Sequence, residues 1–230
     1  MMIFMRKLHK WLGLIVGLQM CIWLLSGLIM SLLDADAVSG DTTAAPAHRA
    51  ESLPANTRIV EPETLLERHR TDAVHDIELM PRFGRWVWRV RTSSGTSLYD
   101  ALEGDRIDID ERLARQIALD GYAGEGALRS AGLVYEPTLE ARGHTLPMWR
   151  VQFDDREQTR FYVSAQDGRI VARRTDAWSV FDVFWMLHTM DYVGRDNFNT
   201  PWVIAFAFMA LWLGISGVLL LIKSFAPRRT

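Results

Sequence analysis

WLGLIVGLQMCIWLLSGLIMSLL, residues 11–33, is a run of 23 residues that contains no charged side chain. A second run without charge, residues 201–222, lies near the other end of the chain. A helix needs roughly 20 apolar residues to cross the hydrocarbon layer of a bilayer, so each run is long enough. A charged residue near the centre of such a helix costs about 2.5–3.5 kcal/mol to insert, which explains why both runs lack one. The sequence therefore predicts two transmembrane helices.

The charged residues are divided unevenly between the ends and the middle of the chain. All 28 acidic residues lie in residues 34–196, with 20 arginines and no lysine, so this segment has a net charge of −8. Basic residues flank the two apolar runs on their outer sides: Arg6, Lys7, Lys10, Lys223, Arg228 and Arg229. Short cytoplasmic flanks are enriched in Lys and Arg, so we expect an inner-membrane protein with both termini cytoplasmic and a periplasmic middle. Arginines dispersed among acids do not favour nucleic-acid binding.

The first apolar run has one alternative interpretation. Residues 6–10, the run itself and Ala35-Asp36-Ala37 resemble a signal peptide with its cleavage site. The run is longer than the ~7–15 apolar residues of a usual signal peptide, so an uncleaved anchor is preferred. Cys21 is the only cysteine, which excludes an intramolecular disulfide. We interpret it as a small apolar side chain of the first helix.

The middle segment begins with the pattern of a linker and then of an α+β unit. Residues 34–54 are rich in Ala, Asp, Ser, Thr and Pro without periodicity, which predicts a linker. Residues 61–66 carry a helix signal, with Pro62 suited to the first turn. The alternation in RWVWRVR, residues 85–91, predicts a strand with one solvated face, and residues 96–101 can pair back onto it.

A similar pattern then recurs along the chain. Residues 111–119 are a candidate helix, and strands are predicted at 146–153, 160–163 and from Ile170 onward. The triplet WRV occurs at residues 88–90 and again at 149–151. The middle therefore has an α+β pattern of two related units, each a helix plus an antiparallel hairpin.

A last helix is predicted before the second apolar run. Its large residues recur at spacings of three and four, on one helical face: Trp178, Phe181, Trp185, His188 and Tyr192. The predicted organisation is then a cytoplasmic N-terminus (1–10), transmembrane helix (11–33), linker (34–54), two α+β units (55–110 and 111–176), amphipathic interfacial helix (177–193), transmembrane helix (200–223) and cytoplasmic tail (224–230).

Two parts of the chain carry a family resemblance. LPMWRVQFDDREQTRFYVSAQDGRIVARR, residues 146–174, resembles a PepSY domain. RKLHKWLGL at residues 6–14 and LHTMDYVGRDNFNTPW at residues 187–202 together resemble the PepSY-associated transmembrane family. The resemblance implies two transmembrane helices that flank an extracytoplasmic α+β PepSY-like domain. It also implies haem chemistry, because larger relatives with four or more spans include haem-containing ferric and siderophore reductases of the bacterial inner membrane.

His9 and His188 are the candidate cofactor-binding residues, as axial ligands of a haem iron. His9 lies two residues before the first apolar run, and His188 lies 13 residues before the second. Ionisable groups in or near spanning segments often mark function, and histidine is a common axial ligand of haem. The alternative is structural. His188 would then be an interface histidine paired with Asp182 or Asp191, and His9 a contact to lipid headgroups.

The thickness of the membrane constrains any haem site. The hydrocarbon layer is ~30 Å thick, so histidines at its opposite faces cannot both bind one iron within one chain. Four helices can enclose a porphyrin and two cannot, so we expect a homodimer that presents each histidine twice. The sequence has no C-x-x-C-H for covalent attachment, so the expected cofactor is haem b. Asp191 or Gln19 are candidates for tuning the ligands through hydrogen bonds.

Other features of the sequence are less informative. Ser26-Gly27 and Ser216-Gly217 open a helix face to close approach by another helix or a flat macrocycle. The sequence contains no G-x-G-x-x-G motif, the pattern that would suggest binding of NADH or a flavin. The remaining histidines lack metal-ligand spacing and are predicted to be surface residues: His48, His69, His75 and His144.

The favoured function is transfer of electrons across the membrane to ferric iron or a ferric siderophore in iron uptake. A quinol or a membrane redox partner would be the electron donor. Alternatives are a membrane-anchored PepSY module that binds or regulates a partner, as a peptidase inhibitor or a chaperone, and an accessory transporter subunit without redox activity.

Overall fold

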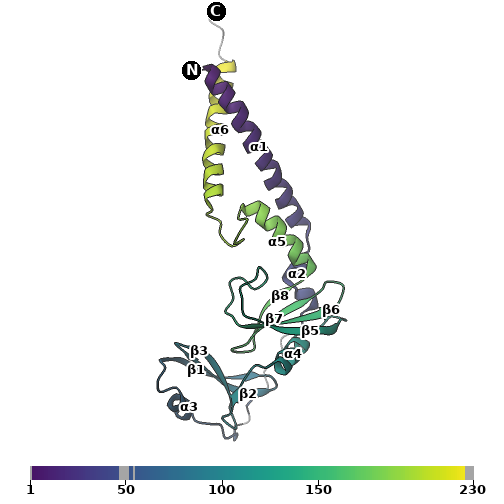
Figure 1. Cartoon of the computed structure of the whole chain (residues 1–230), viewed down its shortest axis with the longest axis vertical. Coiled ribbons are helices and arrows are strands. Elements are labelled where there is room, and N and C mark those ends of the chain that lie inside the picture. The colour runs from purple at the N-terminus through teal and green to yellow at the C-terminus, as the bar shows by residue number, and fades with distance from the viewer. Residues whose placement is uncertain (1, 47–51, 54, 226–230) are drawn as a thin grey trace, which may run out of the picture. The chain divides into compact units, whose positions relative to one another are not determined.

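The structure is a computed structural model that describes residues 2–46, 52–53 and 55–225. The chain divides into a helical unit, Met1–Ala35 with Ala177–Thr230, and a sheet unit, Asp36–Asp176. The predicted fold class is confirmed, since two long apolar helices flank a region of helices and antiparallel sheets (Figure 1). His48, Arg228 and Arg229 were assigned from the sequence but lie outside the described residues.

The helical unit contains α1 (Met2–Leu32), most of α5 (Asp176–Thr189) and α6 (Pro201–Phe225). The apolar part of α1, Arg6–Leu32, has 27 residues, and α6 has 25. At a rise of about 1.5 Å per residue, each exceeds the ~30 Å hydrocarbon layer. The first helix begins at Met2, nine residues before the predicted transmembrane span, so His9 lies within a helix.

α1 and α6 run in opposite directions and contact each other, and they lie closest at the end where α1 begins and α6 ends (Figure 1). Gly13 lies on the interface, where a Cβ would be 3.7 Å from Leu213 Cδ1. Val16 of α1 is almost fully buried. At the start of α6 the Thr200 side chain accepts the Val203 N–H at 3.3 Å and Pro201 fills the first position, as expected of a helix N-terminus.

The turn between α5 and α6 is held by two carboxylates. Asp182 of α5 pairs with Arg195 at 2.5 Å, and both side chains are mostly buried. The Asp191 carboxylate accepts hydrogen bonds from four backbone N–H groups, those of Val193, Gly194, Asp196 and Asn197. These backbone donors, Asn197 first, lower the pKa of Asp191 below its usual value, because they favour the charged carboxylate.

The sheet unit contains two four-stranded antiparallel sheets, each preceded by a helix. The first follows α3 (Pro62–Arg68) and has the order β1 (Val74–Arg82), β2 (Arg85–Thr92), β3 (Gly95–Asp100), β4 (Arg106–Ile107). The second follows α4 (Glu111–Asp120) and has the order β5 (Ala127–Val134), β6 (Met148–Asp154), β7 (Arg160–Ser164), β8 (Ile170–Arg174). Each unit of the predicted repeat therefore supplies one helix and one sheet.

One hydrogen bond recurs in the two halves of the repeat. The indole N–H of Trp88, in β2, donates to the carbonyl of Val60 at 3.0 Å. The indole N–H of Trp149, in β6, donates to the carbonyl of Ile109 at 2.7 Å. Both carbonyls stand two residues before the helix of their unit, so the repeated WRV triplet marks equivalent positions.

The sequence analysis did not predict β1 and β5, which are the first strands of the two sheets. Both are edge strands, each paired on one side only. β1 contains Pro81, which lacks an N–H, and β5 is rich in small residues, as in its sequence ALRSAGLV. Strands of this kind carry a weak pattern, because residues at a sheet edge are only partly buried.

The segment predicted as a linker is partly structured. It contains α2 (Ala35–Ser39) and a 3-10 turn, Asp41–Thr43, and Ala44 forms a bridge with Tyr122. Gly40 has a φ of +77°, and a Cβ there would lie 2.7 Å from Cβ of Arg173. Composition predicted the break in periodicity, but not the contacts that hold residues 37–45 against the sheet unit.

Candidate functional site

His9 lies on α1 and contacts a serine of α6. Its Nδ1 is 2.7 Å from Ser216 Oγ, although the two residues are 207 positions apart in the sequence. Ser216 is only 3 % exposed. The next residue is Gly217, where a Cβ would lie 3.3 Å from Cε1 of the His9 ring. We call Ser216 and Gly217 the His9 seat.

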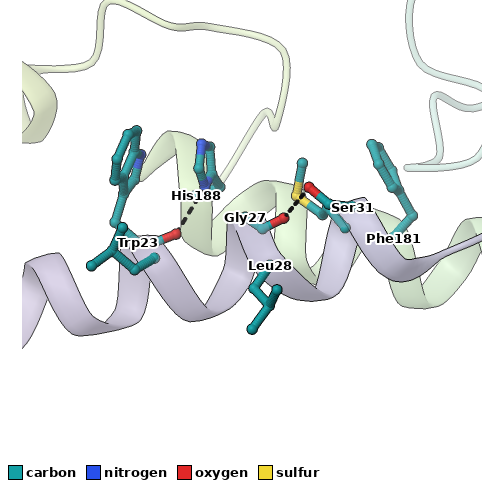
Figure 2. A pocket seen from close by; sticks show the side chains of 8 residues that line it. Trp23, Gly27, Leu28, Ser31, Phe181 and His188 are labelled. Atoms are coloured by element: carbon teal, nitrogen blue, oxygen red, sulfur yellow. Dashed lines mark hydrogen bonds between the residues drawn. The ribbon is translucent and has the colours of Figure 1, made fainter.

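His188 lies near the end of α5 and contacts α1 (Figure 2). Its Nδ1 is 3.2 Å from Ser26 Oγ and 3.1 Å from the carbonyl oxygen of Trp23. Its ring stacks on the indole of Trp23, with centroids 4.7 Å apart. A Cβ on Gly27 would lie 3.0 Å from Cε1 of the ring, so a larger residue would press on the imidazole. We call Ser26 and Gly27 the His188 seat.

The two seats share one construction. In each, a Ser-Gly pair on one helix receives a histidine from another helix: the serine contacts Nδ1, and the glycine leaves room for Cε1. Each serine also donates its own proton to the carbonyl three residues earlier, Trp23 at 2.9 Å or Leu213 at 3.1 Å. The sequence marked both pairs as small residues but did not identify them as partners of the histidines.

The seats lie at opposite ends of the helical unit. Ser26 stands seven residues before the end of the first apolar run, and Ser216 stands six before the end of the second. At the usual helical rise, each serine lies about 10 Å inside its run. His9 and Ser26 are 17 residues apart on α1, which corresponds to roughly 25 Å. One chain therefore presents one histidine at each level.

The second ring nitrogen of each histidine is left open. Within residues 2–46, 52–53 and 55–225, no group of the protein hydrogen-bonds Nε2 of His9 or His188. Beside His188 is an open groove of about 490 Å³. It is lined by Trp23, Leu24, Gly27, Leu28, Met30, Ser31, Phe181 and His188.

Comparison with known families identifies the chain. Residues 6–230 match the family described as the PepSY-associated TM region. The chain belongs to this family. No curated protein and no solved structure gives a match. Together with the two apolar helices, membership makes this PepSY-associated protein a membrane protein whose helices α1 and α6 lie in a lipid bilayer.

The hydrogen-bond partners expected for the histidines of this PepSY-associated protein are not the ones observed. Asp191 was a candidate to pair with His188 or to tune it, but its carboxylate binds backbone N–H groups of the following turn. Asp182 pairs with Arg195. Gln19 lies on α1 between the two seats, and its buried Nε2 has no partner among the described residues. Serine hydroxyls occupy the places where carboxylates were expected.

The histidines of the sheet unit have other surroundings. His75 is exposed, as predicted. His69 and His144 are partly buried rather than at the surface: His69 Nε2 is 2.8 Å from the hydroxyl of Tyr99, and burial, helped by nearby Arg174, lowers the pKa of His144. Among the described residues, no group of three or more His, Cys, Asp or Glu could hold a metal ion.

Proposed function

We propose that this PepSY-associated protein is a haem b electron-transfer protein of the bacterial inner membrane, which supports reduction of ferric iron or ferric siderophores outside the cytoplasm. The observation that carries the proposal is the shared seating of His9 and His188. Each ring is held through Nδ1 on a buried serine, and neither Nε2 has a partner among the described residues. Histidines that bind metal are usually held in this way by their other nitrogen.

The residues present fit haem b. Imidazole is a common axial ligand of haem, and the open groove beside His188 is lined mainly by apolar and aromatic side chains. Cys21 is the only cysteine, so the two thioether bonds of a covalently attached haem cannot form. When bound, haem b supplies a one-electron ferric/ferrous couple. His9 and His188 would hold it, and the apolar helices around them would exclude water.

A homodimer is part of the proposal. One chain offers one histidine at each level, with roughly 25 Å of α1 between them. A twofold axis along the membrane normal would bring two His9 side chains together at one level and two His188 side chains at the other. The dimer would then contain four long helices, which is enough to enclose two cofactors.

The proposed orientation of the protein in the membrane follows from the flanking charges. Lys10 and Lys223 lie at the ends of α1 and α6 that pack together at the His9 seat. By the positive-inside rule this end would be cytoplasmic, and the sheet unit would lie in the periplasm.

Oxidation of one quinol to a quinone releases two electrons and two protons, and two ferric ions take up one electron each. A quinol donor therefore balances the reduction of two ferric ions.

The decisive test is a visible spectrum of the purified full-length protein before and after dithionite, with haem counted per chain. We expect reduced b-type bands and about one haem per chain, because a twofold dimer would hold two. His9→Ala and His188→Ala should each reduce the haem content to about half, and the double variant should contain none. His75→Ala, which removes an exposed histidine of the sheet unit, is the matched control and should keep the full content.

Two further measurements complete the test. The mass of the protein in detergent should correspond to a dimer, and proteoliposomes supplied with a quinol should reduce an external ferric chelate. A colourless protein after expression with ample haem would overturn the proposal, as would haem that persists in the double histidine variant. A colourless protein that captures a defined peptidase or transporter would instead support the membrane-anchored regulatory module or the accessory subunit.

A further inference from the structure

We infer that Ser216 and Ser26 are positioning residues that hold His9 and His188 in the tautomer with the proton on Nδ1, leaving the lone pair on Nε2. We further infer that the His9 seat depends on one hydroxyl, whereas the His188 seat has a second acceptor. The consequences for haem rest on the proposed function. The tautomers themselves rest on the hydrogen bonds of the helical unit.

At the His188 seat, a backbone carbonyl determines where the proton lies. Nδ1 is 3.1 Å from the carbonyl oxygen of Trp23, and a carbonyl oxygen can only accept a hydrogen bond. A lone pair on Nδ1 would face the lone pairs of this oxygen. The proton of the neutral ring therefore lies on Nδ1, and Nε2 carries the lone pair. In Figure 2 the second ring nitrogen of His188 points away from α1.

At the His9 seat, the serine proton has an acceptor of its own in the backbone of α6. Ser216 Oγ donates to the carbonyl of Leu213 at 3.1 Å, three residues earlier on α6. Its oxygen is then the acceptor that faces His9 Nδ1 at 2.7 Å. A neutral imidazole has one N–H, so a donor at Nδ1 again leaves the lone pair on Nε2. The two histidines thus reach the same tautomer through different acceptors.

The difference between the seats lies in the number of acceptors. His188 Nδ1 has two within reach, Ser26 Oγ and the Trp23 carbonyl, and its ring also stacks on the Trp23 indole. Within the described part of the chain, His9 Nδ1 has one hydrogen-bond partner, Ser216. Removing the Ser26 hydroxyl would leave the carbonyl in place. Removing the Ser216 hydroxyl would leave Nδ1 of His9 without an acceptor.

The first experiment measures the tautomers without haem. Full-length, haem-free protein labelled with ¹⁵N at its histidines is examined by NMR in mildly alkaline buffer. The signals of His9 and His188 are assigned by their loss in the two alanine variants. We expect a protonated Nδ1 and an unprotonated Nε2 for both rings. A protonated Nε2 in either ring would overturn the inference for that seat, whether or not the protein binds haem.

The second experiment compares the two seats in variants that keep only one of the two haem-binding histidines. In the His188→Ala background only the His9 haem remains, and there Ser216→Ala should weaken haem binding about 10–100-fold. Ser216→Ala should also raise the midpoint reduction potential of the remaining haem. An imidazole that loses a hydrogen-bond acceptor at Nδ1 donates less electron density to ferric iron. Ser216→Thr, which keeps the hydroxyl, should restore both quantities. In the His9→Ala background, Ser26→Ala should weaken binding less than about tenfold.

The matched control is Ser224→Ala. Ser224 is an exposed serine near the end of α6, and the hydrogen bonds of His9 and His188 do not involve it, so both tautomers should remain unchanged. Equal losses at the two seats, or a Ser216→Thr variant that behaves like Ser216→Ala, would overturn the asymmetry. The two proposals fail separately. Absence of haem contradicts the proposed function, while the NMR measurement still decides the tautomers.

Discussion

The sheet unit and the helical unit satisfy their polar side chains in different ways. In the sheet unit many charges pair at the surface, as Arg106 and Asp108 do, and water can replace either partner. In the helical unit Ser26, Asp182 and Ser216 are at most 3 % exposed, and each has a specific partner. A polar group removed from water needs a partner in the protein, and the acyl chains around α1 and α6 would offer it no hydrogen bond. A polar residue is therefore a stronger guide to contacts in the helical unit than in the sheet unit.

The apolar side chains show the opposite contrast. Leu65 of the sheet unit is 0 % exposed, whereas Leu211 of α6 is 62 % exposed. Leu65 is removed from water by its packing against residues of the first sheet. Leu211 would contact acyl chains, which are as apolar as its own side chain. Packing against other parts of the protein thus removes the apolar side chains of the sheet unit from water. For most of α1 and α6, contact with the lipid acyl chains would do so instead.

The largest expected effect comes from breaking a buried ion pair of the helical unit. Asp182→Ala would leave the Arg195 guanidinium, whose side chain is 17 % exposed, without its ion-pair partner. Loss of one member of such a pair costs about 3–5 kcal/mol. We expect the melting temperature in detergent to fall on the order of 10 °C. Asp108→Ala, which breaks an exposed pair of the sheet unit, is the control and should leave it unchanged. Equal responses to the two substitutions would contradict the comparison.

The same leucine substitution should have different effects in the two units. Leu65→Ala should destabilise the protein by about 2–5 kcal/mol, because it leaves a cavity in the core. Leu211→Ala should change stability by less than about 0.5 kcal/mol, because lipid can fill the space. Denaturation followed by tryptophan fluorescence in nanodiscs would measure both. A large loss for Leu211→Ala would indicate that protein, for example a second copy of the chain, covers that face of α6.

The smallest expected effect concerns the repeated indole hydrogen bond of the sheet unit. Trp88→Phe and Trp149→Phe each remove a donor to a backbone carbonyl, that of Val60 or Ile109. A hydrogen bond of this kind contributes about 0.5–1.5 kcal/mol, so we expect two similar losses near 1 kcal/mol. Chemical denaturation of the two variants would compare them. A loss at one site alone would show that the two halves of the repeat are not energetically equivalent.

The outcome of the sequence predictions follows the strength of each pattern. The long apolar runs and the alternating strand at residues 85–91 were found because every residue in them supports the same interpretation. β1 and β5 were not predicted, because edge strands with Pro81 or many small residues alternate weakly. The first half of the predicted linker, residues 34–54, makes contacts distant in sequence, such as that of Ala37 with Thr175, which composition alone does not indicate.

The candidate site was predictable in its residues but not in its contacts. His9 stands out because it lies two residues before the first run without charges, and His188 because it lies among aromatic residues 13 positions before the second. Ser26-Gly27 and Ser216-Gly217 stand out within those runs. Nothing in the sequence links His188 to Ser26, 162 positions away, or His9 to Ser216. Nearby carboxylates such as Asp191 were the more obvious partners, but that carboxylate binds the backbone of its own turn.

By itself the sequence determined that this protein has two transmembrane helices around a repeated α+β domain, because hydrophobic length and periodicity are local properties of the chain. Only the tertiary structure decided which serine receives which histidine, because that depends on the packing of α1 against α5 and α6. Two helices must approach closely, at a glycine, before an imidazole can reach a hydroxyl on the neighbouring helix. Such proximity is a property of packed helices, and no single segment of the sequence encodes it.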